Sequence, residues 1–339
     1  MAKAWRSILC ALAFSTAGGA AAPAQDSFQG KTLTLLVGAP AGSDYDKLAK
    51  LVAIRLSTQL PGKPAINVDN RSSNAGIDAL NAFAADSPKD GTALHLLMPG
   101  MALLQVLRAP EVRYDAAALG YVGSLSRAPQ VLAAWWVTGF KTIDDGRRRE
   151  MLLGSAGKTS VAAYYPAIIN AVLRTRFRVV DQYRRESEID DAMQNTEIGG
   201  RIVSWNSLMV NHPDWIAGKR VNILAQIGLT RHPDLADVPL LSELVSNERD
   251  KALMTFVSRD SDHALAMAMP AGTPAGTLAL VRRAFDAMVS DAGFLAEARA
   301  ERFDLAPRDG EATAKSVREQ LQTPRDIVER TRAIAQDGL

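Results

Sequence analysis

The chain alternates short apolar segments with longer amphipathic segments. Residues 31–37 alternate in polarity and then run apolar, as a buried strand does, while residues 45–56 carry apolar side chains at helical spacing. Ser43 or Asp44 stands at the right place to cap that helix. The first unit of the chain is therefore predicted to be a strand, a loop and a helix.

This unit repeats in two series, one before and one after the strand expected near residue 123. Strands that alternate with helices predict a mainly parallel sheet covered on both faces, so the two series predict two α/β lobes. No Gly/Ser-rich linker separates them, so we expect strands that cross between the lobes and form a hinge. The expected strands cover 65–68, 93–98, 121–125, 151–153, 177–180, 201–205, 221–227 and 264–269, and the expected helices cover 74–85, 101–107, 160–173, 186–195 and 275–290.

The first two dozen residues differ from the rest. Lys3 and Arg6 precede an apolar stretch that is too short to span a bilayer, and small residues then run to an AxA-type site that ends at Ala24. This pattern predicts a secretory signal peptide over residues 1–24, cut before Gln25. The protein is accordingly expected to be exported.

Removal of the signal changes the charge and the thiol content. The formal net charge falls from +2 to 0, because residues 1–24 hold two basic and no acidic side chains, and Cys10 is lost with them. A neutral protein lacks the basic face that nonspecific nucleic-acid binding requires. A chain without cysteine has no thiol catalysis, disulfide or thiolate metal site.

The stretch "LLGSAGKTS" at residues 152–160 resembles a P-loop, GxxxxGK[ST]. The first glycine of that motif would be residue 152, which is Leu152, so the spacing fails. A strand, a turn of small residues and a helix N-terminus still form a natural anion site, which suits a carboxylate. A tight turn that serves only packing is the alternative reading of this stretch.

Catalytic and metal motifs are missing from the sequence. The four histidines show no HExxH or other metal spacing, and no GxSxG nucleophile elbow occurs. We therefore expect no catalytic residues, no metal, no cofactor and no enzymatic activity.

Four long segments together resemble the Bug receptors, the substrate-binding proteins of tripartite tricarboxylate transporters. They are "GAPAGSDYDKLAKLVA", "NVDNRSSNAGIDALNAFAADSPKDGTALHLL", "VNILAQIGLTRHPDLADVPLLSEL" and "MAMPAGTPAGTLALVRRAFD". The resemblance implies a type II periplasmic-binding-protein-like fold, with two α/β lobes joined by crossing strands. Residues 25–123 and 228–339 would form lobe 1, and residues 124–227 lobe 2.

The resemblance also implies a ligand site on the loops between the lobes. In that family, backbone N–H groups, hydroxyls and ordered waters from the loops of both lobes hold a small carboxylated ligand. Carried over position by position, the lobe 1 residues are Pro40, Gly42, Ser43, Asp44, Tyr45, Asn74, Gly76, Pro99 and Gly100. The lobe 2 residues are Ser155, Gly157, Lys158, Thr159, Ser160, Tyr183, Arg184, Ser204, Trp205 and Asn206.

Several of these residues depart from the family pattern, notably Asp44, Lys158, Arg184 and Ser204. In one interpretation, Lys158 with Arg184 or Arg185 adds charge-assisted hydrogen bonds for a more anionic ligand. In another, Asp44 pairs with those cations across the cleft, and this salt link props the cleft closed or selects a zwitterionic ligand. In the third interpretation, all these side chains are simply exposed to solvent.

The sequence as a whole predicts a periplasmic solute receptor that captures a small organic acid and delivers it to the membrane permease subunits of a tripartite tricarboxylate transporter. The alternatives are a ligand sensor that acts on a sensor kinase, or a periplasmic hydrolase or lyase on the same scaffold. We expect no nucleic-acid partner. We also expect a monomer, since such receptors work by lobe closure and no large apolar stripe is evident.

Overall fold

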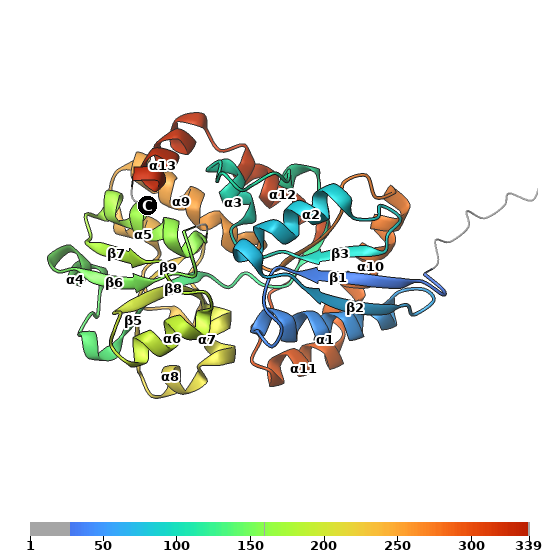
Figure 1. Cartoon of the computed structure of the whole chain (residues 1–339), viewed down its shortest axis with the longest axis horizontal. Helices are drawn as coiled ribbons and strands as arrows, with labels where there is room; N and C mark the ends of the chain where they lie inside the picture. Colours follow the sequence, from blue (N-terminus) through green and yellow to red (C-terminus); the bar gives the residue numbers. More distant parts are fainter. Residues whose placement is uncertain (1–27, 159, 338–339) are drawn as a thin grey trace, which may run out of the picture.

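Two β-sheets lie end to end along the longest axis of the molecule, each with helices on both faces (Figure 1). The computed structural model describes residues 28–158 and 160–337, so the expected signal peptide and its cleavage site lie outside the described residues. We call the half built on the six-stranded sheet the first lobe and the half built on the five-stranded sheet the second lobe. The α/β fold class predicted from the sequence is confirmed.

The sheet of the first lobe has the strand order β11-β4-β10-β3-β1-β2. Strand β1 pairs in parallel with β2 and β3, whereas β10 is antiparallel to both β3 and β4. The strands are β1 (Thr32–Val37), β2 (Ala65–Asn70), β3 (Ala93–Leu96), β4 (Gly120–Ser124), β10 (Ala266–Met269) and β11 (Arg308–Asp309).

Alternating side chains of this sheet face two different helix layers. On β1, Leu33 and Leu35 pack with one layer, and Leu36 packs with the other. The first layer holds α1 (Asp44–Gln59), α10 (Ala275–Ser290) and α11 (Ala292–Ala300), and the second holds α2 (Ile77–Asp86), α3 (Met101–Val106) and α12 (Gly310–Leu321).

The sheet of the second lobe has the strand order β7-β6-β8-β5-β9, likewise between two helix layers. Its strands are β5 (Gln130–Trp135), β6 (Met151–Gly154), β7 (Phe177–Val180), β8 (Gly200–Ser204) and β9 (Val221–Ile227). One layer consists of α6 (Glu186–Gln194), α7 (Trp205–Asn211) and α8 (Pro213–Ala217), and the other of α5 (Val161–Leu173), α9 (Glu248–Ser258) and α13 (Arg325–Asp337).

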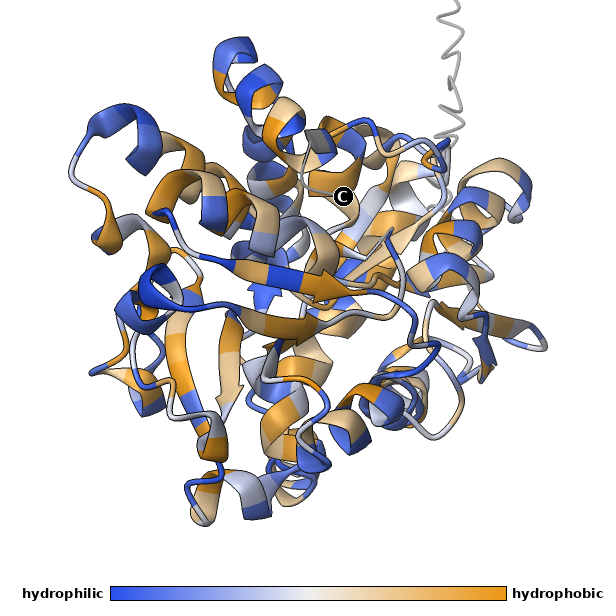
Figure 2. Ribbon diagram, turned by 60° about the vertical axis from the view of Figure 1, so that its left-hand side comes forward, coloured by the Kyte–Doolittle hydropathy of each residue, from blue (hydrophilic) through white to orange (hydrophobic). Residues whose placement is uncertain are grey.

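The connections hold the remaining short elements. Helix α4 (Ile143–Arg148) precedes β6, and 3-10 helices cover Ser73–Gly76, Ala116–Ala118, Trp136–Thr138, Pro233–Leu235, Leu241–Leu244 and Arg259–His263. In Figure 2 the strands are mostly orange, whereas the helices carry both blue and orange stretches. This is the distribution expected of sheets buried on both faces and of helices buried on one. Among the described residues, none of the helices is both long and apolar enough to cross a bilayer.

The sheets are more mixed than the expected mainly parallel arrangement, and a central strand was missed. Strand β5 lies antiparallel between β8 and β9, although the sequence analysis predicted no strand over 130–135. Both β5 and β10 are the first strands that the chain forms after it passes from one lobe to the other. A strand that re-enters a sheet in this way is free to run against its neighbours, because no crossover helix fixes its direction.

One apolar core runs through both lobes on the side of α5, α9, α12 and α13. Helix α12 packs on β4 and α3 of the first lobe, and α13 packs on α5 and α9 of the second. The last helix of the chain therefore contacts the second lobe, a contact that the sequence pattern did not indicate. The proposed lobe boundaries near residues 123 and 227 stay a prediction.

A buried ion-pair network fixes β8 against α6 in the second lobe. Arg201 is 3% exposed and pairs with Asp190 and Glu186 at 2.5 Å each. Asp190 also bonds to His212 at 2.9 Å, and the His212 ring stacks on Trp215. Burial by itself would raise the pKa of Asp190, but His212 and Arg201 hold that pKa below its ordinary value.

We expect Asp190→Ala to lower the free energy of unfolding by about 3 kcal/mol, because it removes one partner of a buried arginine. Chemical denaturation followed by circular dichroism measures this loss. Asp191→Ala is the matched control, since Asp191 is the exposed neighbour in the same helix and should change stability by less than about 0.5 kcal/mol. Equal effects of the two substitutions would contradict the structural role of the network.

Candidate ligand site

The loops that follow strands of both sheets meet between the lobes. In the first lobe, the loop after β1 leads into α1 and the loop after β3 leads into α3. In the second lobe, the loop after β6 leads into α5, and β8 runs directly into α7. Helices α1 and α7 lie side by side where the lobes face each other (Figure 1). The carboxyl ends of strands in α/β sheets are the usual ligand-binding edge.

Asp44 makes the polar contact between the two sets of loops. It is the first residue of α1 and is only 8% exposed. Its Oδ2 atom accepts a hydrogen bond of 2.6 Å from the hydroxyl of Ser207 in α7. Burial raises the pKa of Asp44; the hydrogen bond from Ser207 lowers it in part, and the negative charge of Glu186 raises it again.

Tyr45 lies beside Asp44 and shares its surroundings. Burial raises the pKa of the Tyr45 phenol well above its ordinary value, and the charges of Asp44 and Glu186 raise it further. Ser207 hydrogen-bonds with this phenol, and Arg201 lies near enough to lower its pKa in part. The start of α1 therefore faces the network of Arg201 and Glu186 in the second lobe.

Gly100 makes the apolar contact between the lobes, at the N-terminus of α3. It adopts a left-handed conformation with φ of +87°, and a Cβ atom built on it would lie 2.1 Å from Cγ1 of Val161, the first residue of α5. Only glycine combines that backbone conformation with so close an approach. The starts of α3 and α5 are therefore in direct contact.

The loop before α5 forms a compact turn rather than a P-loop. Ser155 is fully buried, and its hydroxyl donates to the Gly157 carbonyl at 3.0 Å and lies 2.7 Å from the hydroxyl of Ser160. Gly157 has a φ of +92° with open space around it. Thr159, which the sequence analysis placed in this site, lies outside the described residues.

The loop after β2 is held in an unusual backbone conformation. Asn74, Ala75 and Gly76 have positive φ angles in succession, which is costly for residues with a side chain. Gly76 packs against Gly38 of the loop after β1 and against Met98 of the loop after β3. The loops after β1, β2 and β3 are therefore in contact with one another. Pro99, beside Gly100, is half-buried.

The turn before α1 uses its polar groups internally. The N–H group of Gly42 donates to Asp46 at 2.7 Å, and the hydroxyl of Ser43 caps the helix by accepting from the N–H group of Asp46. Pro40 and Gly42 are exposed. The cap expected from the sequence at Ser43 or Asp44 is Ser43.

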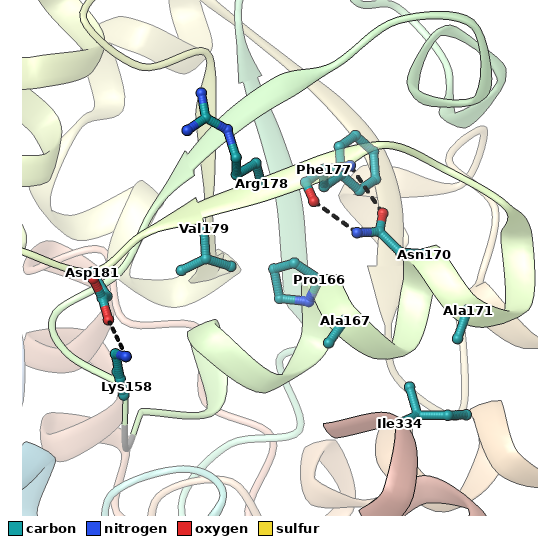
Figure 3. Close-up of a pocket in the computed structure, with 10 residues that line it drawn as sticks. All are labelled: Lys158, Pro166, Ala167, Asn170, Ala171, Phe177, Arg178, Val179, Asp181 and Ile334. Atoms are coloured by element: carbon teal, nitrogen blue, oxygen red, sulfur yellow. Dashed lines mark hydrogen bonds and ion pairs between the residues drawn. The ribbon is translucent and has the colours of Figure 1, made fainter. Parts of the chain in front are cut away.

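Lys158 points away from the contact between the lobes. Its ammonium lies 3.9 Å from Asp181, at one end of a groove of about 680 Å³ on α5 and the edge strand β7 (Figure 3). Pro166 and Val179 line the floor of this groove, and Ile334 of α13 lies at its far side. The Lys158 side chain is 67% exposed, so this ion pair contributes little to stability.

Arg184 and Arg185 are exposed at the start of α6, and Tyr183 beside them is half-buried. The backbone N–H group of Arg184 and the guanidinium of Arg185 both donate to Glu188. Asp44 bonds to Ser207 instead, so the salt link between Asp44 and these cations considered in the sequence analysis is wrong.

The segment over residues 204–206 connects the lobes behind the facing loops. Ser204 ends β8, and the helix begins at Trp205, where the sequence pattern had continued the strand. Asn206 is buried and bonds to Ser126 at 3.0 Å and to the backbone of Asp304. Trp205 is buried too, and its indole N–H group has no hydrogen-bond partner among the described residues.

The sequence analysis missed the residues that complete the contact, namely Ser207, Val161, Glu186 and Arg201. The strand predicted over 201–205 hid the helix start that brings Ser207 to Asp44. Within residues 28–158 and 160–337, no group of three or more His, Cys, Asp or Glu side chains could hold a metal ion. The role of each site residue in ligand binding stays a prediction.

The buried position of Asp44 predicts a pH-dependent effect on stability. A raised pKa means that the folded state holds its proton above pH 3.8, the ordinary value, so ionisation at higher pH disfavours folding. We expect Asp44→Asn to increase the free energy of unfolding at pH 8 by on the order of 1 kcal/mol, because an amide needs no desolvation of charge. The gain should vanish as the pH falls well below 3.8, where Asp44 is protonated in both states. Urea denaturation across this pH range measures it, and a gain that grows toward acid would contradict this assignment.

Comparisons with known proteins find relatives in sequence and in fold. No family model matches the chain. It is 26% identical to the UPF0065 protein in the tcbD–tcbE intergenic region of Pseudomonas sp. (strain P51), over 70% of each chain. It is 27% identical to a UPF0065 protein of Bordetella bronchiseptica, over 80% of this chain and 76% of the other.

Solved structures share the fold at lower identity. A TctC solute binding protein from Polaromonas superposes with a TM-score of 0.66 at 15% identity, over 92% of this chain and all of the other. A Rhodopseudomonas palustris protein solved with adipate has a TM-score of 0.68 at 19% identity, over 89% and 97% of the two chains. MatC of the same organism, solved with malate, has a TM-score of 0.66 at 17% identity, over 88% of this chain and 98% of the other. The fold is therefore that of the periplasmic binding proteins, and these findings together confirm the resemblance of the chain to the Bug and TctC receptors of tripartite tricarboxylate transporters.

Proposed function

We propose that the chain is a periplasmic receptor that closes its two lobes over a small organic acid and presents the closed form to membrane permease subunits. The observation that carries the proposal is the direct apposition of strand-end loops from two lobes, at the Asp44–Ser207 hydrogen bond and at the Gly100–Val161 contact. Loops arranged in this way surround a ligand when the lobes part and close again.

The comparisons support the same function. Two proteins of this fold were solved with adipate and with malate, both of which are small dicarboxylates. In our chain, the N-terminus of α5 supplies backbone N–H donors and the positive end of a helix dipole on the side of the second lobe, beside the half-buried side chain of Ser160. We infer that these groups receive a carboxylate of the ligand.

A receptor of this kind is stabilised by its ligand. We expect at least one of malate, adipate, aspartate and 6-aminohexanoate to raise the melting temperature in a thermal-shift assay, because a ligand that binds only the folded state shifts the unfolding equilibrium. Glycerol at the same concentration is the control for nonspecific stabilisation. The proposal fails if a well-folded preparation shows no shift with any small carboxylate.

Closure of the lobes should depend on the absence of a side chain at residue 100. We expect Gly100→Ala to weaken ligand binding by about tenfold or more, because its Cβ would collide with Val161 in the closed form. Isothermal titration measures the affinity, and small-angle X-ray scattering should show a larger radius of gyration.

Gly30→Ala is the matched control for Gly100→Ala. Gly30 also has a positive φ, of +73°, but a Cβ atom there would meet no atom within 4 Å, and it lies in the turn before β1. Both substitutions should cost about 1–2 kcal/mol of stability from backbone strain. Unchanged affinity in Gly100→Ala, or an equal loss in both variants, would contradict closure at this contact.

A further inference from the structure

The carboxylate of Asp44 is buried between the lobes without a cation. It accepts a hydrogen bond across the lobes from the neutral hydroxyl of Ser207, and among the described residues no Lys, Arg or His forms an ion pair with it. Burial of an ionised carboxylate without a cation is costly. The closed form therefore contains a negative group that lacks its best partner.

The nearby cations are engaged elsewhere. Lys158 pairs with Asp181 on the outer groove, and Arg185 pairs with Glu188 at the surface. Arg201 lies near enough to the start of α1 to act on the pKa of Tyr45, and it is already shared between two carboxylates, those of Glu186 and Asp190.

Glu186 adds a further negative charge near Asp44. Its carboxylate acts on both Asp44 and Tyr45 as a second negative charge from the second lobe. Arg201 compensates for one of the three nearby carboxylates of Asp44, Glu186 and Asp190, which leaves an excess of negative charge where the lobes face each other. A small cation placed beside Asp44 would remove the excess.

We propose that Asp44 is the specificity-determining residue of this receptor and that it selects ligands in which an ammonium group accompanies the carboxylate, such as amino acids, over dicarboxylates. This inference rests on the proposed function, since it names the ligand class of the same site. The ammonium replaces Ser207 as the partner of Asp44 or joins it. The carboxylate of the ligand is left for the backbone N–H groups at the N-terminus of α5.

Two pairs of probes isolate the ammonium group. Aspartate and malate differ by an amine in place of a hydroxyl, and 6-aminohexanoate and adipate differ by an amine in place of a terminal carboxylate. We expect the amine in at least one pair to bind the full chain about 10- to 100-fold more tightly, as a charge-assisted hydrogen bond to a buried carboxylate requires. Isothermal titration at neutral pH gives both affinities.

Variants at the site assign the preference to Asp44. Asp44→Asn keeps the shape and removes the charge, so the preference for the amine should fall to less than about threefold or reverse. Asp44→Ser also removes the charge, with a smaller polar group, and takes the place of Asp44→Asn in this test if that variant does not fold. Ser207→Ala removes the neutral partner alone and should keep the preference, as should the exposed control Asp191→Ala.

Each outcome decides a separate point. If neither amine binds more tightly than its counterpart, malate or adipate, the inference is overturned and the proposed function stands. A preference for the amine that survives in Asp44→Asn overturns the assignment to Asp44. Absence of binding by all four probes to folded protein overturns both the inference and the proposed function.

Discussion

The contact between α1 and α7 is the constraint on which the account depends. Asp44 reaches Ser207 only because the first turn of α1 and the first turn of α7 stand opposite each other, and this placement follows from the sheets that precede them. A buried carboxylate is tolerated there because α1 also offers it N–H groups at its N-terminus. The same placement puts the strand-end loops of both lobes within reach of one small molecule.

The two lobes are held together unequally on the two sides of this contact. On the side of α5, α9, α12 and α13 a single apolar core continues through both halves, whereas the helices on the opposite side pack into separate cores, one for each lobe. A motion that opens the site therefore costs least if the lobes part on the side of α1 and α7 and bend about the shared core. Gly100 touches Val161, which itself packs against the shared core.

Sequence reasoning predicted the architecture well because the apolar periods are strong. Residues 177–180 and 221–227 form strands with the predicted bounds, and the helix over 275–290 also matches. The strand over 130–135 was missed because after Gln130 it is a continuous apolar run ending at Trp135, without the polar alternation or the long following helix that marked most of the others. The resemblance to a receptor family supplied the expected position of the ligand site, which neither composition nor spacing could provide and which stays a prediction.

The details of the site were beyond the sequence because they depend on partners far apart in the chain. Asp44 and Ser207 are 163 residues apart, and nothing near either residue indicates the other. Likewise, the segment "GSAGKTS" does not indicate which way the Lys158 side chain points, since this depends on Asp181 at the end of the adjacent strand. Long charged side chains take whichever partner the tertiary structure brings near, so their roles cannot be carried over from a motif alone.

Hydrogen–deuterium exchange, measured with and without a mixture of malate, adipate, aspartate and 6-aminohexanoate, tests the central claim most directly. Binding between the lobes predicts protection of the backbone amides in four segments together, residues 38–47, 98–104, 155–164 and 204–210, which lie in both lobes. Protection restricted to one lobe, protection at the outer groove of α5 and β7 instead, or no protection in any segment would contradict the account.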